Sequence, residues 1–419
     1  MKLLIRVALT TLLLVSSLDS VTALPHGQSL EDVLDKRATT ARATPTACPT
    51  PTVPIGAGGG PLATRSGRLF QIQSKTQYFA GTNTWWLGHI QSNADVDNVL
   101  ADLALTQLKV TRVWGFGNAN DAANPGSGVY YQVLNSTGQY FNCDSNSEFL
   151  GIPRLDYVIS AAEKKGVKIV LPLLNNFDDL GGIDTYARAF GTDHNGFYTN
   201  AAAQAAYKAW IKFIVNRYKS SAAIFSWELC NEPRCSGCAT SVITNWVKNI
   251  SAYIKSLDST HMVAIGDEGW LAPPSGDGSY AYSGYEGVDF QTNLGISTID
   301  YGSFHLYPEQ WGYNYTWGNT WITQHNAIGK KLGKPVVLEE YGSTYTPKTT
   351  IAKPYQDTVL QQTSVAYDSF WQFATTLSNG VNPYDNYAIY YNQTTGSDYD
   401  VLGFKHAAAM LAKNPTATL

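Results

Sequence analysis

Two acidic segments of this chain each follow an apolar run that has the character of a buried β-strand. The run Ala222–Trp227 leads into Asn231-Glu232-Pro233, and the run Pro335–Leu338 leads into Glu339-Glu340. Proline disfavours helix in the residue before it, so Glu232 is expected near the end of a strand. Two carboxyl groups that meet at one edge of a sheet can divide proton donation and nucleophilic attack between them. We therefore predict that Glu232 faces a carboxylate of the second segment in one active site.

The elements that must position these acids follow a regular alternation. Short β-branched or aromatic runs alternate with longer segments of helical periodicity, which is typical of parallel strands joined by crossover helices. No glycine-rich fingerprint follows the first strand, which argues against a dinucleotide-binding sheet. The sequence therefore predicts an α/β fold, a TIM-type (β/α)8 barrel over Arg65–Leu419. Its predicted strands are Tyr78–Asn83, Val110–Trp114, Lys168–Leu173, Ile224–Leu229, Met262–Gly266, Gly302–His305, Pro335–Glu340 and Ser369–Phe373.

Apolar residues recur at helical spacing in two of the intervening segments. The stripes are core positions of crossover helices and not cofactor sites. A third helix is predicted to end at Lys164-Lys165-Gly166, because cations and glycine are preferred at helix C-termini. The two stripes comprise Tyr207, Trp210, Ile211, Ile214 and Tyr218, and Val242, Ile243, Trp246, Val247, Ile250, Ile254 and Leu257.

In such a barrel the functional groups lie at the C-terminal ends of the strands. The polar and aromatic residues expected there are rich in tryptophan, carboxylate and amide, and they contain no Ser-His-Asp set, no metal-ligand cluster and no phosphate cradle. We therefore predict no metal and no cofactor. The residues are Asn83–Trp86, Arg112–Trp114, Asn175-Asn176, Asn231-Glu232, Asp267-Glu268, His305–Tyr307, Glu340 and Trp371.

A sugar ring presents hydroxyl groups at its rim and an apolar C–H face, so its site needs amides, charges and flat aromatic walls. Five tryptophans could supply such walls, or could pack in the core as tryptophan commonly does. They are Trp85, Trp114, Trp311, Trp317 and Trp371. Cleaving a glycosidic bond needs a proton for the leaving oxygen and stabilisation of an oxocarbenium-like centre, and two carboxyl groups supply both. We expect the two carboxyls to lie roughly 5 to 5.5 Å apart, which gives retention of configuration.

A set of motifs in this order resembles glycoside hydrolase family 5 over essentially all of Arg65–Leu419. The motifs are Arg112, Asn231-Glu232-Pro233, His305-Leu306-Tyr307, Glu340-Tyr341-Gly342 and Trp371. Three segments are more narrowly similar to the secreted fungal endo-β-1,4-mannanases of that family. These are the Asn-Glu-Pro-Arg-Cys-x-x-Cys stretch Asn231–Cys238, the opening Gly81–Trp86, and Arg112–Phe116.

The resemblance implies a role for each matching residue. Glu232 would be the acid/base and Glu340 the nucleophile of a retaining enzyme that cleaves internal bonds of mannan, galactomannan and glucomannan. Asn231 would hold the 2-hydroxyl of the sugar under attack, and Arg112 and Tyr307 would orient the nucleophile. The remaining matches are to sugar-contacting positions, with His305 and Trp371 lining the cleavage subsite and Arg234 and Glu268 as further contacts. Trp85 and Trp114 are candidate walls through their aromatic chemistry. The chain departs from the family in lacking several cysteines near the end of the barrel and in carrying Trp86.

Strand geometry alone does not choose between Glu339 and Glu340, because neighbours on a strand point to opposite faces. The family resemblance selects Glu340. We expect Glu340→Gln to abolish turnover and Glu339→Gln to leave most of it. Glu228 lies within its strand, where a buried acid needs a partner such as an arginine, so we interpret it as structural.

Other interpretations remain open at this point. His305 could be a hydrogen-bonded barrel histidine without a role in turnover. Arg112 could be a structural ion pair, although holding a nucleophile ionised is itself a function. The same machinery would serve a family 5 endo-β-1,4-glucanase or an exo-β-mannosidase, and an inactive carbohydrate-binding barrel is a more distant alternative.

The N-terminal segment of the chain indicates export. Lys2 and Arg6 precede an apolar stretch and small residues, which predicts a signal peptide over residues 1–23. Residues 24–37 end in Lys36-Arg37 and form a predicted propeptide, and residues 38–64 form a Thr/Pro/Gly-rich linker, expected to be disordered over Thr39–Pro61. The formal net charge of −4 gives no electrostatic footprint for nucleic acid or an anionic membrane. We expect a secreted monomer whose partner is a neutral polysaccharide.

The cysteines and sequons fit a secreted protein. Cys235 and Cys238 are expected to form a disulfide, Cys230 is expected to be a buried free thiol, and the pairing of Cys48 and Cys143 is left open. The Asn-x-Ser/Thr sequons are compatible with surface glycosylation. They lie at Asn135, Asn249, Asn314 and Asn392.

Overall fold

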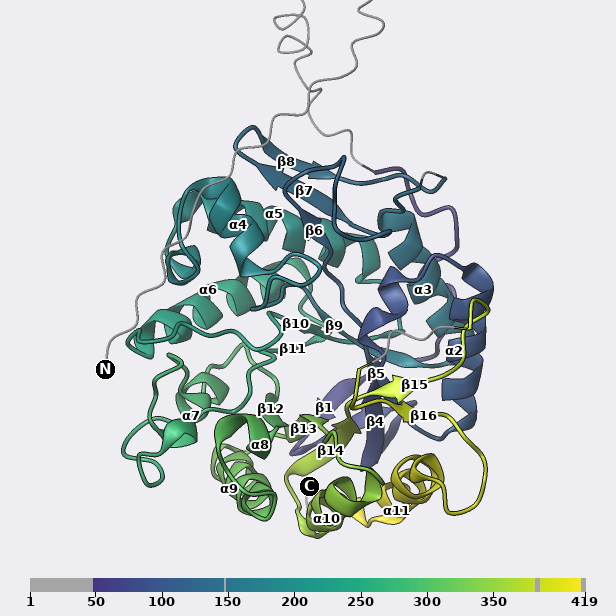
Figure 1. The fold of residues 1–419 in the computed structure, drawn as a ribbon, viewed down its shortest axis with the longest axis vertical. Helices are drawn as coiled ribbons and strands as arrows, with labels where there is room; N and C mark the ends of the chain where they lie inside the picture. Colours follow the sequence, from purple (N-terminus) through teal and green to yellow (C-terminus); the bar gives the residue numbers. More distant parts are fainter. Residues whose placement is uncertain (1–47, 147, 381–384, 416–419) are drawn as a thin grey trace, which may run out of the picture. The chain divides into compact units, whose positions relative to one another are not determined.

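The computed structural model describes residues 48–146, 148–380 and 385–415, and Figure 1 shows their fold. Eight parallel strands form the central sheet in the spatial order β11-β10-β9-β5-β4-β14-β13-β12. The predicted barrel is confirmed. The predicted signal peptide and propeptide lie outside the described residues. The eight strands are β4 (Phe79–Asn83), β5 (Val110–Arg112), β9 (Lys168–Pro172), β10 (Ile224–Glu228), β11 (Met262–Ala264), β12 (Gly302–Leu306), β13 (Val336–Tyr341) and β14 (Val365–Phe370).

The barrel closes between β11 and β12 through a few bonds that replace a regular ladder. The Val263 N–H donates to the Asp300 carboxylate at 2.7 Å, and the Gly266 N–H donates to the Ser303 hydroxyl oxygen at 3.0 Å. The His305 N–H donates to the carbonyl of Glu268 at 3.2 Å. These contacts join the last two strands and place His305 beside the loop that follows β11.

Helices and short turns connect the strands. Both predicted stripes are largely buried, on α5 and α6, and α3 ends at Gly166 in the left-handed conformation, as its sequence predicts. The helices are α2 (Asn93–Leu105), α3 (Ile152–Lys165), α4 (Ile183–Phe190), α5 (Ala201–Tyr218), α6 (Ser241–Leu257), α7 (Phe290–Leu294), α8 (Pro308–Trp311), α9 (Trp317–Leu332), α10 (Thr349–Gln361) and α11 (His406–Ala412). Shorter 3-10 segments are η1 (Trp85–His89), η2 (Asn195–Tyr198) and η3 (Tyr280–Tyr282), and η4 (Asp400–Lys405) is a π-helix.

Three small sheets accompany the barrel, and one of them closes its N-terminal end. Phe70 on β2 packs its ring 5.1 Å from Phe225, 5.2 Å from Tyr301 and 5.8 Å from Tyr367, measured between centroids. This aromatic plug leaves the C-terminal end for the site. The small sheets contain β1 (Thr64–Ser66), β2 (Leu69–Ile72) and β3 (Lys75–Gln77); β6 (Asn118–Ala119), β7 (Gln132–Asn135) and β8 (Gly138–Phe141); and β15 (Phe373–Ala374) and β16 (Ile389–Tyr390).

The eighth strand starts earlier than predicted. It is β14, Val365–Phe370, and not Ser369–Phe373, because pairing with β4 already begins at Tyr367 opposite Phe79. The polar Asp368 and Ser369 interrupt the apolar run and hide the strand in the sequence. Trp371 therefore follows the strand end and reaches the site from there.

Strand β13 contains a β-bulge at the predicted acids. Leu338 and Tyr341 pair with Phe304 and Leu306 on β12, so β13 carries one residue more than its neighbour over this span. The same excess occurs against β14, where Leu338 and Tyr341 pair with Asp368 and Phe370. A bulge changes the alternation of side chains along a strand. The expectation that Glu339 and Glu340 point to opposite faces is therefore wrong.

The segment expected to be a disordered linker is held against the barrel over its described part, residues 48–61. The Gly56 N–H donates to the Glu163 carboxylate at 2.8 Å. The ammonium group of buried Lys168 donates to the carbonyls of Gly59 and Pro61 at 3.1 and 3.2 Å. The expectation failed because these backbone groups find partners on the barrel, so order here does not require burial of large apolar side chains.

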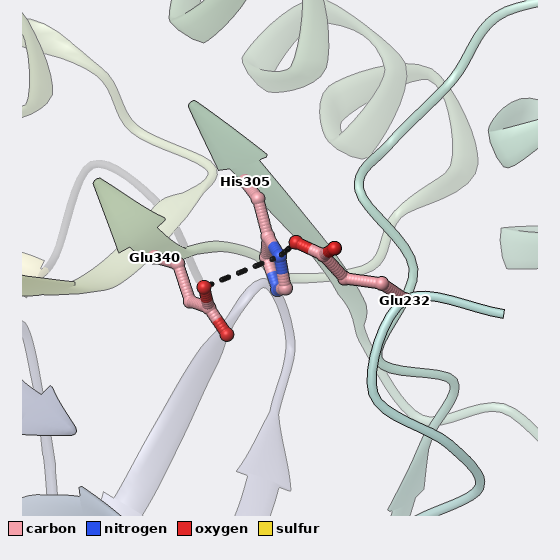
Figure 2. Close-up of side chains that lie close together, drawn as sticks. All are labelled: Glu232, His305 and Glu340. Atoms are coloured by element: carbon pink, nitrogen blue, oxygen red, sulfur yellow. Dashed lines mark hydrogen bonds and ion pairs between the residues drawn. The ribbon is translucent and has the colours of Figure 1, made fainter. Parts of the chain in front are cut away.

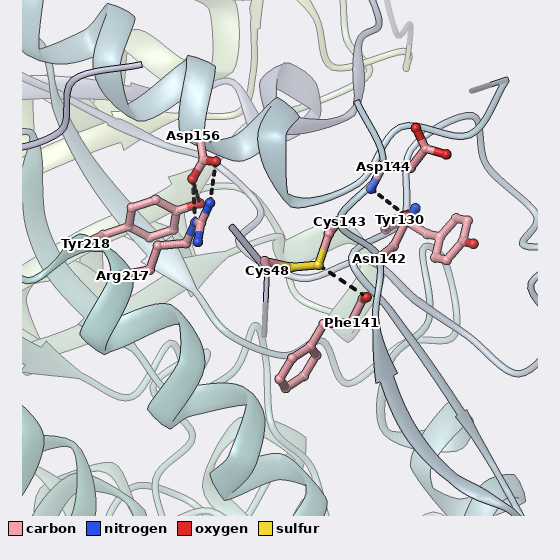
Figure 3. The surroundings of a disulfide bond; sticks show 9 residues. All are labelled: Cys48, Tyr130, Phe141, Asn142, Cys143, Asp144, Asp156, Arg217 and Tyr218. Carbon is pink, nitrogen blue, oxygen red and sulfur yellow. Dashed lines mark hydrogen bonds and ion pairs between the residues drawn. A yellow bond between two sulfur atoms is a disulfide. The ribbon is translucent and has the colours of Figure 1, made fainter. Parts of the chain in front are cut away.

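The structure contains one disulfide that the sequence predicted and one whose pairing the sequence left open. Cys235 pairs with Cys238, and Cys230 is buried and free, both as predicted. Cys48 pairs with Cys143, which fastens the segment before β1 to the loop after β8 (Figure 3).

The sequon side chains Asn249, Asn314 and Asn392 are exposed and Asn135 is partly exposed. No helix among the described residues is long and apolar enough to cross a membrane.

Removing the Cys48–Cys143 bond with Cys48→Ala/Cys143→Ala is expected to lower the free energy of unfolding by about 2–4 kcal/mol, because it closes a long loop with a sequence separation of 95. The matched control, Cys235→Ala/Cys238→Ala, opens a separation of only 3 and is expected to cost less. Chemical denaturation measures both. A smaller loss in the first variant than in the second would contradict this assignment.

Candidate active site

The structure brings Glu232, His305 and Glu340 together at the C-terminal end of the barrel (Figure 2). Glu232 follows β10, His305 lies on β12 and Glu340 lies on β13. One oxygen of each carboxylate and one ring nitrogen of His305 all lie within 4.8 Å of one another. Glu232 has a positive φ of 50°, a conformation uncommon for side chains other than glycine, and its N–H donates to the Gly266 carbonyl at 2.7 Å. The loop after β10 is thus fixed so that the acid faces β13.

Glu340 is held by two donors. Arg112 Nη1 forms an ion pair and hydrogen bond with Glu340 Oε1, and the Tyr307 hydroxyl donates to Oε2 at 2.9 Å. Burial raises the pKa of Glu340, while the positive charges of His305 and Arg112 and the Tyr307 hydrogen bond oppose that rise. The donors stabilise the ionised form that nucleophilic attack requires.

Arg112 also binds the end of β10 and the loop that follows it. Its Nη2 donates to Glu228 Oε1 at 2.6 Å and to Asn231 Oδ1 at 2.8 Å. Glu228 therefore has the arginine partner that its burial predicts. The Asn231 amide nitrogen in turn donates to Asn175 Oδ1 at 2.9 Å, which fixes the orientation of the Asn231 side chain.

Glu232 is paired with His305, whose Nδ1 lies 2.7 Å from Glu232 Oε1. Burial alone would lower the pKa of His305, but Glu340, Glu232 and Glu339 outweigh it and raise the pKa well above its ordinary value. Burial alone would raise the pKa of Glu232, but the bond to His305 and the charges of His305, Arg234 and Arg112 outweigh it and lower the pKa. The His305–Glu232 pair therefore holds one proton across its contact, and these shifts favour the His305 side.

A second ion pair lies beside Glu232. Arg234 binds Glu268 through two hydrogen bonds of 2.7 and 2.6 Å, and its Nη2 lies 3.7 Å from Glu232 Oε2. The Trp270 indole also donates to Glu268 at 2.9 Å. The Arg234 guanidinium lies 5.4 Å from the centroid of the Phe177 ring, within cation–π range. This cluster makes a polar wall with one aromatic edge.

Three of the predicted tryptophans also line the cleft, and their rings form an aromatic wall. The Trp85 and Trp371 rings are parallel within 2° with centroids 6.4 Å apart, and Trp114 lies 5.8 Å from Trp371. The Trp371 indole donates to Asp385 at 2.7 Å, and the Arg112 guanidinium lies 4.7 Å from the centroid of the Trp114 ring. Flat faces arranged in this way suit the apolar face of a sugar.

The other two tryptophans proposed as walls do not line the cleft. Trp311 and Trp317 pack in an aromatic cluster with Trp270 and Trp321, at centroid distances that include 4.4 Å and 5.0 Å. Of the two roles that the sequence left open for them, the structure shows core packing. The reason is that both belong to the helical segments α8 and α9, where aromatic residues at i and i+4, such as Trp317 and Trp321, stack on each other.

The walls enclose a cleft of about 300 Å³. Of the predicted site residues, Arg112 and His305 lie outside the lining and bind the acids that do line it. Sequence reasoning missed five lining residues, Phe177, Asp179, Gln310, Asp385 and Tyr387, and had marked Asn175 only as a strand end. These positions lie in loops and on α8, where no periodicity marks them, although Phe177 follows closely on the end of β9. The cleft is lined by Trp85, Trp114, Asn175, Phe177, Asp179, Asn231, Glu232, Arg234, Glu268, Tyr307, Gln310, Glu340, Trp371, Asp385 and Tyr387.

Comparison with known proteins agrees with this geometry. A family model described as glycoside hydrolase family 5, β-mannosidase-like, matches residues 62–376. The chain belongs to glycoside hydrolase family 5. Within the family it is 48% identical to mannan endo-1,4-β-mannosidase A of Aspergillus aculeatus over 350 residues, covering 83% of this chain and 90% of the relative. It is 45% identical to mannan endo-1,4-β-mannosidase A of Hypocrea jecorina over 334 residues, covering 80% and 75%.

A solved family 5 structure has the same fold. The endo-1,4-β-mannanase from Rhizomucor miehei superposes with a TM-score of 0.75 at 34% sequence identity, over 84% of this chain and 99% of the other. The resemblance seen in the sequence motifs is thereby confirmed at the level of family and fold.

Tyr307→Phe is expected to move the acidic limb of the pH profile of kcat/KM to higher pH. The variant loses a hydrogen bond that stabilises ionised Glu340, so the pKa of Glu340 rises and the carboxylate is protonated at a higher pH. Hydrolysis of a manno-oligosaccharide across the pH range measures this. Tyr387→Phe is the matched control, since that hydroxyl accepts from Gln310 and lines the same cleft. An acidic limb that stays in place in Tyr307→Phe, or moves equally in both variants, would contradict the assignment.

Proposed function

We propose that this protein is a retaining endo-acting glycoside hydrolase that cleaves internal β-1,4-mannosidic bonds of mannan, galactomannan and glucomannan. The single observation that carries the proposal is the approach of Glu232 and Glu340 to within 4.8 Å in a cleft walled by tryptophans. Inverting enzymes need a wider spacing of about 6.5–9.5 Å to admit a water molecule between acid and sugar. The curated relatives named as mannan endo-1,4-β-mannosidases support the choice of linkage.

In the first step Glu340 attacks the anomeric carbon while Glu232 donates its proton to the leaving oxygen. The glycosidic C–O bond breaks, a glycosyl ester forms on Glu340, and the leaving chain departs with the proton as a new hydroxyl group. The shared proton of the His305–Glu232 pair supplies the acid, because it can lie on Glu232 across their 2.7 Å contact.

In the second step Glu232 acts as a base. It takes a proton from a water molecule whose oxygen attacks the anomeric carbon, the ester bond to Glu340 breaks, and the sugar leaves with its original configuration. The proton is then back on the His305–Glu232 pair and Glu340 is ionised, as at the start. No metal or other group is needed to balance either step.

The surrounding residues position the sugar in this proposal. Arg112 and Tyr307 hold Glu340 ionised, and Asn231, oriented by Arg112 and Asn175, meets the 2-hydroxyl of the sugar under attack. Trp371, Trp85 and Trp114 form the apolar wall of the cleavage subsite. The Arg234–Glu268 pair contacts a neighbouring sugar unit through the polar atoms that face the cleft.

We further propose that the protein is exported and acts as a monomer outside the cell. The apolar stretch after Lys2 and Arg6, the dibasic Lys36-Arg37 and two disulfides support export. The mature chain would then comprise the remainder of the linker, part of which is bonded to the barrel, and the catalytic barrel.

Side-by-side release of reducing ends from galactomannan, glucomannan and carboxymethylcellulose tests the proposed substrate. We expect release from both mannans, and from mannohexaose we expect internal cleavage with the β-anomer formed first, as read by mass spectrometry and NMR. Glu340→Gln is expected to lose turnover by about a thousandfold or more, because the covalent step fails. Glu309→Gln, an exposed acid on α8, is the control and should keep it.

Different results would select the alternatives. Release confined to carboxymethylcellulose would identify an endo-β-1,4-glucanase, and release of mannose alone from chain ends would identify an exo-β-mannosidase. Binding of mannan without any turnover would identify a carbohydrate-binding barrel. A first-formed α-anomer would contradict the retaining mechanism.

A further inference from the structure

Glu339 lies next to the proposed nucleophile, and the mechanism above gives it no role. Its side chain is 1% exposed, and its Oε2 lies 3.4 Å from His305 Nε2 and 3.6 Å from Arg112 Nε. The bulge in β13 produces this placement, because regular alternation would turn Glu339 away from the face that Glu340 occupies. A buried acid directed at catalytic neighbours by an irregular strand calls for a functional explanation.

The contacts of Glu339 connect the two halves of the site. Arg112 binds Glu340, and His305 binds Glu232. Apart from Glu340 itself, Glu339 is the acid among the described residues with ion-pair contacts to both of these cations. A change at Glu339 therefore acts on the groups that hold the proposed nucleophile and the proposed acid/base.

We propose that Glu339 is a positioning residue whose carboxylate accepts the Nε2–H of His305 and so keeps the proton that His305 shares with Glu232 on the Nδ1 side. The proposal rests on the proposed function, since it assigns the control of an acid/base step. It adds to that function a residue that touches neither substrate nor reacting atoms and that acts through His305.

The physical basis of this assignment is that the two ring nitrogens of histidine influence each other's protonation. The hydrogen bond at one ring nitrogen decides which protonation states the other can adopt. A neutral His305 that carried its proton on Nδ1 would present the bare Nε2 lone pair to the Glu339 carboxylate, which is repulsive. With Nε2 protonated, Nδ1 can hold a proton when Glu232 is ionised and release it when Glu232 is the acid. One proton thus moves between the two atoms that lie 2.7 Å apart.

The charges around His305 support an ionised Glu339. Burial favours the neutral acid, but Arg112 and the bond and charge of His305 outweigh it and lower the pKa of Glu339. The groups whose charges act on His305 come from several strands of the barrel. They are Glu232 and Glu228 from β10 and its loop, Asp267 and Glu268 after β11, and Glu339 and Glu340 from β13, while Arg112 from β5 binds three of these acids.

The competing interpretation is that Glu339 only neutralises Arg112. Glu228 offers a matched control, because it is equally buried and binds Arg112 through both of its oxygens. Among the described residues the ion-pair contacts of Glu228 are with Arg112, whereas Glu339 also reaches the His305 ring. A role in neutralising Arg112 predicts the same behaviour for both acids, and a role through His305 predicts a difference.

The test is the pH profile of kcat/KM for mannohexaose hydrolysis in Glu339→Gln, Glu339→Asp and Glu228→Gln. Glu339→Gln removes a negative charge that stabilises the protonated His305–Glu232 pair, so its basic limb is expected to move to lower pH by about one unit or more. Glu339→Asp keeps the charge and should return the limb towards its original position. Glu228→Gln should move the basic limb less than Glu339→Gln does, because Glu228 acts on His305 through its charge alone and Glu339 also bonds to the ring. A basic limb that does not move in Glu339→Gln, or that moves equally in Glu228→Gln, would overturn the proposal.

A second measurement needs no variant. Nitrogen-15 NMR of the histidine rings in the unaltered protein should show Nε2 of His305 protonated across the pH range of activity, with Nδ1 gaining and losing the proton along the basic limb. A bare Nε2 with a protonated Nδ1 would overturn the proposal even if the Glu339 variants failed to fold. Absence of mannan hydrolysis by the same sample would instead overturn the proposed function, so the two failures are distinguishable.

Discussion

The buried guanidinium of Arg112 is the interaction on which the site depends. It lies at the end of β5 and binds Glu228, Asn231 and Glu340, with Glu339 at 3.6 Å, so residues of two strands and the loop after β10 converge on one cation. Taking such a charge out of water costs several kcal/mol unless it is paired and fully hydrogen-bonded. The barrel supplies those partners from β10 and β13 at once. A shift of either strand would leave the buried charge of Arg112 without a partner. The positions of the acids are therefore tightly constrained.

His305 is the second cation of the site. It forms an ion pair with Glu232, as Arg112 does with Glu340. Both cations also contact Glu339. More carboxyls than cations are buried here, and burial raises the pKa of Glu228 to about 8. The protonation of each acid in the site therefore depends on the charges of its neighbours. A site of this kind can hold one carboxyl as a base and another as an acid at the same pH.

The sequence predicted the barrel and the meeting of the two acids because both follow from local patterns. Apolar runs mark strands, and parallel strands in a barrel end at the same face. The features that the sequence did not predict depend on contacts between residues far apart in the chain. The bulge that turns Glu339 inward is visible only against β12 and β14, and the segment before β1 is ordered by the Lys168 ammonium and the Cys48–Cys143 bond. The role of Trp311 and Trp317 stayed open because a tryptophan of the core and one of a cleft look alike in a sequence.

Such departures from local rules concentrate where the chemistry is. The positive φ of Glu232 and the bulge at Glu339 both occur beside proposed catalytic groups, where a strained or irregular backbone can be retained because it aims a side chain. By contrast, the helical stripes of α5 and α6 and the aromatic plug around Phe70 obey ordinary packing. The regular parts of the fold thus support a small irregular region that carries the function.

The most direct test of the central claim is to trap the covalent intermediate. A 2-fluoro mannoside with a reactive leaving group should form a stable ester, because the fluorine slows the second step more than the activated first step. Fragmentation of the labelled peptide by mass spectrometry then locates the sugar. The account predicts one label, on Glu340, in the pair Glu339-Glu340. A label on Glu339 would contradict it, as would full turnover of the reagent with inverted product and no label.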